Sequence, residues 1–385
     1  MNIKPSERVA SVQEYYLQRK MKEVAALNAA GADIVSLGVG GPDMPPPPAA
    51  VQTLCSEAGR ASTHGYQVTA GIREYRDAWA RFYARHYGVE LDPDTMIQPM
   101  IGSKEAILHI TMAFINPGDI ALVPDPGYPT YTSASRLAGA VVRPYSLTAE
   151  NGWMPDFDAL EQTPLEGVKL MWLNYPHMPT GTPALRSVFE KAVEFGRRHD
   201  IVIAHDNPYS FILNDAPMSI LQVPGATDVA LELNSLSKTF NMAGWRMGMV
   251  ASNPQYIGWI LKVKSNVDSG QFKPAMLAAA AALDTDDAWF SALNASYTER
   301  RSIAERIMTA LGCSFDPSQR GLFLWGRIPD SESGSEAMAD RVLRDYRVFI
   351  TPGFIFGKNG ERYIRISLCA PPERLDEALR RITEK

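Results

Sequence analysis

Three mostly apolar runs in the middle of the chain each end in a polar residue. The runs cover residues 168–173, 201–206 and 229–233, and the polar residues at or just after their ends are Asn174, Asp206 and Ser235. Apolar runs without strict alternation are typical of strands buried on both faces of a parallel sheet. Because ligands bind at the carboxyl ends of strands in open α/β sheets, we expect an α/β fold with its site at these three positions.

Length and composition indicate an ordinary enzyme of more than one structural unit. The chain has 385 residues, of which 45% are hydrophobic and 21% are charged, and this length exceeds what one hydrophobic core usually serves. A net charge of −5 leaves no basic surface for nucleic acid. The first residues lack the apolar core of a signal peptide, and no run approaches the ~18 apolar residues of a membrane span. We therefore expect a cytoplasmic protein with neither nucleic acid nor membrane as a partner.

The cysteines and histidines do not predict a disulfide framework or a metal centre. Cys55, Cys313 and Cys369 are scattered and odd in number, as expected of reduced thiols. The six histidines show no metal-ligand spacing. We predict no metal.

Lys238 lies just beyond the third apolar run, among small hydroxyl residues. Ser235 and Ser237 precede it, and Arg246 follows eight residues later. A lysine that acts as a nucleophile needs partial desolvation and nearby cations to lower its pKa, and Phe240 and Arg246 could supply both. Hydroxyl groups and a guanidinium group also suit a phosphate. The same residues would also be compatible with a surface lysine beside a serine-rich turn.

This stretch resembles the lysine region of the class I and II aminotransferases, which are pyridoxal-phosphate enzymes of fold type I. In that family the corresponding lysine forms a Schiff base with the cofactor, and the serine three residues before it and the arginine eight residues after it hold the phosphate. The resemblance assigns these roles to Lys238, Ser235 and Arg246, with Ser237 as a further phosphate contact. It implies a large domain with a mostly parallel central sheet and a smaller α/β domain.

Two glycine-containing loops extend the resemblance. The segment 38–43 is no dinucleotide fingerprint, because Asp43 stands where a third glycine is needed, and it resembles instead the loop that faces the substrate, at Gly40. Gly102, Ser103 and Lys104 open a predicted helix, where free N–H groups and the helix dipole favour an anion. They form our second set of phosphate contacts.

Two tyrosines take roles from the family. Tyr128, after a predicted strand over 121–123, matches the aromatic residue that stacks on the pyridine ring. Tyr66 matches a tyrosine that crosses to the neighbouring subunit and binds the phosphate there, which implies a homodimer with shared sites. The alternative for Tyr128 is a structural aromatic residue in a proline-rich turn. The alternative for Tyr66 is a tyrosine that packs on its own subunit.

Asp206 and Tyr209 match the residues that tune the cofactor ring. A carboxylate at the end of an apolar strand is costly without a partner, and the protonated pyridine nitrogen is such a partner. The resemblance adds Asn174 and Tyr209 as ring contacts. Met178 departs from the family, in which an asparagine at this place usually donates a hydrogen bond to the phenolic oxygen of the cofactor. The thioether of a methionine cannot donate such a bond. We expect Tyr209 to be the main donor, and His177 is the alternative.

Arg365 lies in an alternating apolar strand predicted over 362–368. An arginine in such a place indicates an anionic partner, because its charge is not removed by deprotonation. The resemblance makes it the residue that binds the substrate α-carboxylate. An ion pair within the protein is the alternative.

The remaining patterns predict the domains and the activity. We expect an N-terminal arm and part of a small domain over 1–45, a large cofactor domain over 46–272 and a small domain over 273–385. Further helices are predicted over 11–30, 72–87, 106–114, 256–264, 274–283, 336–346 and 372–383, and further strands over 322–328 and 348–350.

The expected activity is transfer of an amino group from an α-amino acid to 2-oxoglutarate, with Lys238, Asp206 and Tyr209 as catalytic residues. The contexts of Tyr66 and Tyr128 look closest to the aspartate and LL-diaminopimelate subgroup. A β C–S lyase of the same fold and a non-catalytic, pyridoxal-phosphate-binding regulatory protein are the alternatives.

Overall fold

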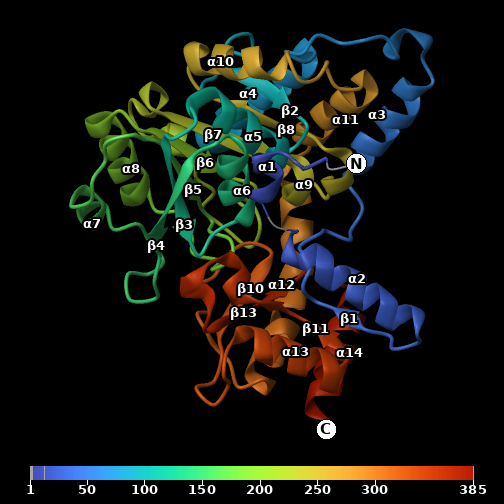
Figure 1. Cartoon of the computed structure of the whole chain (residues 1–385). Coiled ribbons are helices and arrows are strands. Elements are labelled where there is room, and N and C mark those ends of the chain that lie inside the picture. The colour runs from blue at the N-terminus through green and yellow to red at the C-terminus, as the bar shows by residue number, and fades with distance from the viewer. Residues whose placement is uncertain (1–2, 13, 385) are drawn as a thin grey trace.

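The structure is a computed structural model that describes residues 3–12 and 14–384. Two unequal bodies are built around separate sheets, with the large sheet in the upper part of Figure 1 and the small one, drawn in orange and red, below it. None of the helices in the described ranges combines the length and hydropathy that crossing a bilayer requires. The two sheets and their helices form the α/β architecture that the apolar runs predict.

The large sheet has seven strands in the order β2-β8-β7-β6-β5-β3-β4. Only β8 runs antiparallel to its neighbours. The strands are β2 (Ile97–Met100), β3 (Ile120–Asp125), β4 (Val141–Ser146), β5 (Val168–Asn174), β6 (Val202–Asp206), β7 (Ala230–Ser235) and β8 (Gly248–Ala251).

The adjacent strands β5, β6 and β7 end at Asn174, Asp206 and Ser235. Asn174 stands opposite Asp206 in the register. The predicted placement of these three residues at one edge of a parallel sheet is confirmed.

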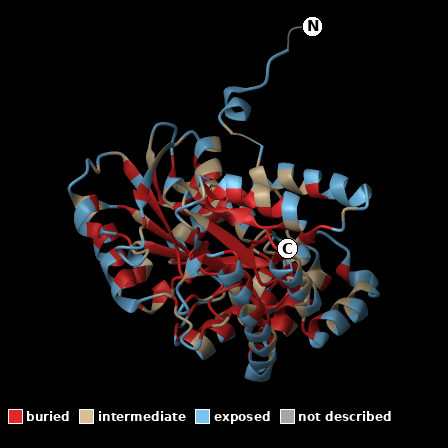
Figure 2. Ribbon diagram, turned by 90° about the horizontal axis from the view of Figure 1, so that it is seen from below, coloured by how far each residue is buried: buried red, intermediate tan, exposed pale blue. Residues whose placement is uncertain are grey.

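Helices cover both faces of the large sheet. The helices of the chain are α1 (Glu7–Ala10), α2 (Tyr16–Ala29), α3 (Pro48–Ala58), α4 (Arg73–Tyr87), α5 (Ser103–Phe114), α6 (Pro129–Leu137), α7 (Phe157–Glu161), α8 (Arg186–His199), α9 (Leu236–Thr239), α10 (Pro254–Lys264), α11 (Lys273–Leu283), α12 (Asp287–Ala310), α13 (Ser335–Tyr346) and α14 (Pro372–Thr383). Alternate residues of β5 show the two faces, because Met171 and Leu173 pack toward α4 and α8 whereas Leu170 and Trp172 pack toward α5 and α6. Figure 2 shows the resulting buried band inside the molecule.

The smaller body combines both ends of the chain. Its antiparallel sheet has the order β12-β13-β10-β9, with β9 (Ser314–Phe315), β10 (Phe323–Arg327), β12 (Thr351–Pro352) and β13 (Tyr363–Ser367). A parallel pair joins β1 (Val35–Ser36) to β11 (Val348–Phe349), so the N-terminal segment lies against the C-terminal part. Helix α11 packs on α3 and α4, which groups it with the large sheet although we predicted that the large domain ends at residue 272. The domain limits stay a prediction.

The segment before α2 carries an exposed N-terminal helix. Helix α1 has no buried residue, although it contacts α6, and Figure 2 shows it as an extension near the N-terminus. The helix that we predicted over 11–30 begins only at Tyr16, and residue 13 of that prediction lies outside the described residues.

Some elements were not predicted, for identifiable reasons. Strand β4 lies at an edge of the sheet, is largely exposed and contains Arg143 and Pro144, so it has no apolar run. Helix α8 buries only a narrow apolar face that includes Phe189 and Phe195. Helix α3 begins at Pro48, directly after three further prolines over 45–47, and this run has no helical apolar pattern.

Glu232 on β7 is fully buried and joins three parts of the large body. Its carboxylate accepts hydrogen bonds from Tyr83 Oη (2.5 Å), Ser219 Oγ (2.9 Å) and the Ile220 N–H (3.0 Å), and it lies 2.8 Å from His205 Nδ1. This network fastens α4 and the loop after β6 to the sheet, behind the strand ends that form the site.

We expect Glu232→Ala to lower the free energy of unfolding by about 3–5 kcal/mol, because several buried donors lose their acceptor together. Glu232→Gln keeps one acceptor oxygen and should cost about 1–3 kcal/mol. Urea unfolding of both variants at equal protein concentration measures the difference. Equal losses in the two variants would contradict the proposed role of the network.

Candidate active site

A cavity of about 570 Å³ opens at the carboxyl ends of β5, β6 and β7. Residues of the large sheet, the small sheet and the N-terminal segment line it together. The predicted site residues among them are Gly40, Ser103, Lys104, Tyr128, Asn174, Asp206, Tyr209, Ser235, Ser237, Lys238, Arg246 and Arg365. The predicted site residues outside the lining are Gly102, which contacts Arg246, and Tyr66.

Lys238 reaches the cavity from α9, the short helix that follows β7 directly. Its side chain is partly buried, and its ammonium group donates to the Gly40 carbonyl oxygen at 2.5 Å. Burial lowers the pKa of Lys238, and the nearby guanidinium groups of Arg365 and Arg246 lower it further. The amine is therefore easier to deprotonate than an ordinary lysine, as a nucleophile requires.

Asp206 presents one carboxylate oxygen with no protein partner. Its Oδ2 accepts a hydrogen bond from Tyr131 Oη at 2.8 Å, whereas Oδ1 is buried without a donor from any described residue. Burial raises the pKa of Asp206 to about 6, and the hydrogen bond from Tyr131 limits that rise. A buried acceptor that lines a cavity fits a ligand with a protonated nitrogen.

The other end of the cavity has the donors for a phosphate. Ser103 opens α5, and its buried Oγ has no partner among the residues that the structure covers. Ser235 Oγ lies 2.8 Å from Ser237 Oγ at the start of α9. A helix N-terminus, hydroxyl groups and the guanidinium group of Arg246 form a suitable cradle for an anion.

Gly102 allows Arg246 to approach this cradle. Its φ of 75° belongs to the left-handed region, and a Cβ atom at this position would lie 2.3 Å from Arg246 Nη2. Arg246 also donates from Nη1 to the Ala243 carbonyl oxygen at 2.9 Å. Any larger residue at 102 would displace the guanidinium group.

The Lys104 side chain lines the cavity beside Tyr15. It is exposed, and its ammonium group lies 5.7 Å from the ring centroid of Tyr15 in the N-terminal segment. Only its backbone N–H remains in the first turn of α5. The predicted phosphate contact of Lys104 stays a prediction for the side chain.

The loop after β5 does not replace the hydrogen bond that Met178 cannot make. His177 is buried, its Nδ1 lies 2.8 Å from Thr180 Oγ1, and it is absent from the described lining of the cavity. Asn174 donates to the Asp206 carbonyl oxygen and accepts from the Met178 N–H, so both ends of its amide are engaged. Tyr209 lines the cavity, and burial raises the pKa of its hydroxyl group, which therefore stays a donor.

Arg365 on β13 is buried without an acidic partner in the described ranges. It donates to the Gly38 carbonyl oxygen at 3.0 Å, and its guanidinium carbon lies 3.9 Å from the ring centroid of Phe323 and 4.7 Å from that of Phe356. Burial lowers its pKa to about 10. The alternative of an ion pair within the chain has no counter-ion here, which favours an anionic ligand.

Tyr66 lies outside the cavity of its own chain. Its side chain is 95% exposed. A contribution to a site in this protein requires a second subunit, as the family resemblance implies.

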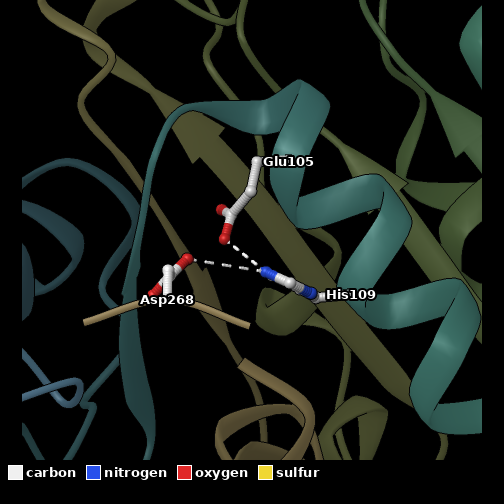
Figure 3. Close-up of side chains that lie close together, drawn as sticks. All are labelled: Glu105, His109 and Asp268. Carbon is white, nitrogen blue, oxygen red and sulfur yellow. Dashed lines mark ion pairs between the residues drawn. The ribbon is translucent and has the colours of Figure 1, made fainter. Parts of the chain in front are cut away.

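Glu105 and His109 of α5 form a cluster with Asp268 (Figure 3). His109 Nε2 is 2.5 Å from Glu105 Oε1 and 3.8 Å from Asp268 Oδ2. The buried ammonium group of Lys264 is 2.8 Å and 2.7 Å from the same two carboxylate oxygens, so the cluster already contains its cation. Glu105 Oε2 also accepts from the Ile101 N–H at 2.9 Å, next to Gly102. The cluster thus braces the start of α5, and the absence of a metal stays a prediction.

Sequence reasoning missed several residues of the site. Tyr131 lies one helical turn after Tyr128 on α6, and this spacing was the only available signal. Phe323 and Phe356 look like ordinary core residues in the sequence, and Tyr15 belongs to the arm. Position 40 requires a glycine, because a Cβ atom there would lie 2.3 Å from the ring of Phe323.

Comparisons with known proteins agree with this geometry. The family model of aminotransferase class I and II matches residues 32–382. The LL-diaminopimelate aminotransferase of Oleidesulfovibrio alaskensis is 40% identical over 98% of each chain, and that of Gloeobacter violaceus is 42% identical over 92% of this chain and 91% of the relative. The solved structure of apo-BacF from Bacillus subtilis is 37% identical, with a TM-score of 0.95 over 100% of this chain and 98% of that chain.

A lysine of lowered pKa, a buried carboxylate with a free oxygen and a set of donors for an anion, all in one cavity, fit the chemistry of pyridoxal phosphate. The chain belongs to the class I and II aminotransferases. It is therefore a pyridoxal-phosphate-dependent transaminase whose substrates are small amino acids and 2-oxo acids. The predicted family, fold class, enzyme class and cofactor are confirmed.

We expect Tyr131→Phe to weaken binding of pyridoxal phosphate about tenfold at pH 7, because Asp206 loses its one hydroxyl donor. Affinity should fall as the pH drops through the pKa of Asp206, about 6 in the unmodified protein, and this fall should move to higher pH in the variant. Fluorescence titration of apoprotein between pH 5 and 8 measures both effects.

Tyr145→Phe is the matched control for this prediction. It removes a buried hydroxyl that donates to the Trp172 carbonyl oxygen at 2.7 Å without touching Asp206. An equal shift in both variants would show that Tyr131 acts only through packing.

We expect Glu105→Gln to weaken pyridoxal phosphate about tenfold and pyridoxal, which lacks the phosphate, far less. The reason is that Glu105 Oε2 accepts from the Ile101 N–H next to Gly102 and so fixes the backbone at the start of the phosphate cradle. Dissociation constants of the two ligands for the apoprotein give the comparison. A proportional loss for both ligands would contradict a role at the phosphate end.

Proposed function

We propose that this transaminase moves the amino group of an α-amino acid to 2-oxoglutarate, with the cofactor attached through a Schiff base to Lys238. The observation that supports this most is the placement of the Lys238 amine in one cavity with the free oxygen of Asp206 and the unpaired Arg365. An amine, a ring-binding carboxylate and a carboxylate-binding cation are the three groups that the reaction needs.

The phosphate end of the cofactor would be held by Gly102, Ser103, Ser235, Ser237 and Arg246. These residues bring hydroxyl groups, backbone N–H groups and one fixed guanidinium group to the same end of the cavity. Their contacts anchor the cofactor by its strongest charge.

The ring end would be held by Asp206, Tyr209, Tyr128 and Asn174. Bound pyridoxal phosphate supplies an electron-withdrawing ring that stabilises negative charge on the substrate Cα. The free Asp206 oxygen accepts from a protonated ring nitrogen and keeps that nitrogen charged. Tyr209 donates from its neutral hydroxyl group, and Asn174 fixes the backbone of Asp206.

Lys238 and Arg365 would act on the substrate itself. Arg365 binds the α-carboxylate in a forked geometry, and Gly40 offers the backbone beside it. With its lowered pKa, Lys238 takes the proton from Cα and returns it as general base and acid. Fixing both ends of the substrate aligns its Cα–H bond with the amine, and such positioning lowers barriers by up to ~7–11 kcal/mol in ideal cases.

We also propose a homodimer in which Tyr66 completes the neighbouring site. Its 95% exposure and the N-terminal segment, with Ile3 and Val9 exposed, are features that a second subunit would cover. A cytoplasmic location remains our expectation as well.

Borohydride reduction of the loaded protein should fix the cofactor on the peptide that contains Lys238. Lys238→Arg should keep the charge, lose the label and lower the rate of amino transfer at least about 10³-fold, because the base and the attachment point disappear together. Peptide mapping and a coupled assay with 2-oxoglutarate provide the readouts. A label on another lysine would refute the proposal, and release of pyruvate and a thiol without use of the oxo acid would indicate the β C–S lyase.

A further inference from the structure

One contact between the two bodies lies between the two ends of the proposed site. Strand β3 of the large body ends at Asp125, and the short turn η6 (Lys358–Gly360) of the small body contacts this strand. The chain after Asp125 leads to Tyr128 in the cavity, and the chain after η6 leads to Arg365 on β13. We call this contact the β3 clamp, and its residues are Asp125, Gly127, Phe356, Gly357 and Asn359.

Hydrogen bonds hold the β3 clamp from both sides. The Asn359 N–H donates to Asp125 Oδ1 at 3.0 Å, and the Asn359 side-chain amide donates to the Asp125 carbonyl oxygen at 3.0 Å. The same amide reaches the Leu147 carbonyl oxygen at 3.3 Å. In return, the Gly127 N–H donates to the Phe356 carbonyl oxygen at 2.8 Å. The end of β3 and the residues after it therefore bind one loop of the small body through several groups.

Gly357 shows how closely this loop approaches Asp125. Its φ of 140° is one that other residues rarely adopt, and a Cβ atom at this position would overlap Asp125 Oδ1. Burial raises the pKa of Asp125, and hydrogen bonds from the backbone N–H groups of Asn359 and Lys358 lower it. The carboxylate is thus fitted against the loop and is not an ordinary solvated surface group.

Phe356 connects the β3 clamp to the substrate end of the cavity. Its buried ring lines the cavity, and the guanidinium carbon of Arg365 lies 4.7 Å from the ring centroid. The face of an aromatic ring attracts a cation and so favours one placement of the guanidinium group. The direction of Arg365 therefore depends on where the loop holds Phe356.

The other side of the β3 clamp leads to the cofactor end of the cavity. Gly127 stands directly before Tyr128, and α6 follows with Tyr131, whose hydroxyl group donates to Asp206. One contact thus fixes the loop of Phe356 relative to the residues around the cofactor ring. This placement matters because small errors in the position of the reacting groups lower the rate strongly.

We propose that Asp125 is a positioning residue for amino transfer, which holds the loop of Phe356 on the end of β3 and thereby sets the Arg365 guanidinium group relative to the cofactor ring. This inference rests on the proposed function, because it uses the contact of Arg365 with the α-carboxylate. Asp125 is absent from the described lining of the cavity, so it acts through Phe356 and Arg365. Its loss should weaken the reaction of an amino acid and spare a reaction that needs no α-carboxylate.

The test compares two reactions of the holoenzyme by stopped-flow absorbance of the cofactor. L-glutamate carries an α-carboxylate, and it must react with the cofactor if 2-oxoglutarate is the amino acceptor. Methoxyamine carries no carboxylate, and it releases the lysine from the cofactor by forming an oxime ether. We expect Asp125→Ala to lower the second-order rate constant for L-glutamate about tenfold, mainly through weaker binding, and to change that for methoxyamine less than about twofold.

Two variants control for loss of the carboxylate as such. Asp125→Asn keeps an acceptor oxygen for the Asn359 N–H and should stay within about threefold of the unmodified protein with L-glutamate. Asp156→Ala removes a carboxylate that accepts from the Ala159 N–H at 2.9 Å at the start of α7, outside the described cavity lining. It should leave both rate constants unchanged.

The outcomes separate the inference from the proposed function. An Asp125→Ala variant that reacts with L-glutamate as fast as Asp156→Ala would overturn the inference and leave the proposed function standing. Equal losses with L-glutamate and methoxyamine would also overturn it, because Asp125 would then only support the fold. If L-glutamate does not react with the unmodified holoenzyme, the proposed function fails and the inference with it.

Asn359→Ala provides the same test if Asp125→Ala does not retain the cofactor. It removes only the side-chain donors to the Asp125 and Leu147 carbonyl oxygens and leaves the backbone N–H in place. We expect a loss of about threefold with L-glutamate and none with methoxyamine. Unchanged reaction with L-glutamate would count against the β3 clamp.

Discussion

The site depends on a carboxylate oxygen that the protein leaves unpaired. Asp206 Oδ1 is buried at the end of β6, where water cannot replace a missing donor. Tyr131 occupies the other oxygen and fixes its direction, while the stack of Tyr131 on Trp172, with ring centroids 4.9 Å apart, holds the tyrosine. In the proposed site a bound cofactor satisfies this oxygen, which would couple cofactor binding to the stability of this strand end.

The N-terminal segment completes the site because it is fastened at several points. Strand β1 pairs with β11 of the small body, and Asp43 forms an ion pair with the buried Arg300 of α12 at 2.6 Å. Between these two attachments, the carbonyl oxygens of Gly38 and Gly40 receive donors from Arg365 and Lys238. The substrate-facing loop is therefore positioned by the small body while it contacts the lysine of the large body. Its geometry follows the relative placement of the two bodies.

The sequence predicted the strand-end residues well because one physical rule governs them. Asn174, Asp206 and Ser235 end apolar runs, and such runs are typical of strands that are buried on both faces of a parallel sheet. Tyr131, Phe323 and Phe356 could not be predicted, since they serve the site through contacts between distant segments that have no local pattern. The Lys104 ammonium group lies 5.7 Å from the Tyr15 ring centroid, in a segment far away in the sequence, and its contact with the phosphate stays a prediction. Long-range packing, rather than local propensity, decides these positions.

Four charged residues of the cavity account for the class of reaction but not for the choice of substrate. In the proposed reaction, Asp206, Lys238, Arg246 and Arg365 bind parts that every substrate complex of a transaminase contains, namely the cofactor, the reacting amine and the α-carboxylate. None of them distinguishes one amino acid from another. Discrimination between amino acids therefore depends on other residues of the lining, which include Gln18 and Met21 of α2 and Lys104. Similarity to LL-diaminopimelate aminotransferases, at 40% identity, therefore shows the class of reaction, whereas residues other than these four charged groups decide which donor reacts.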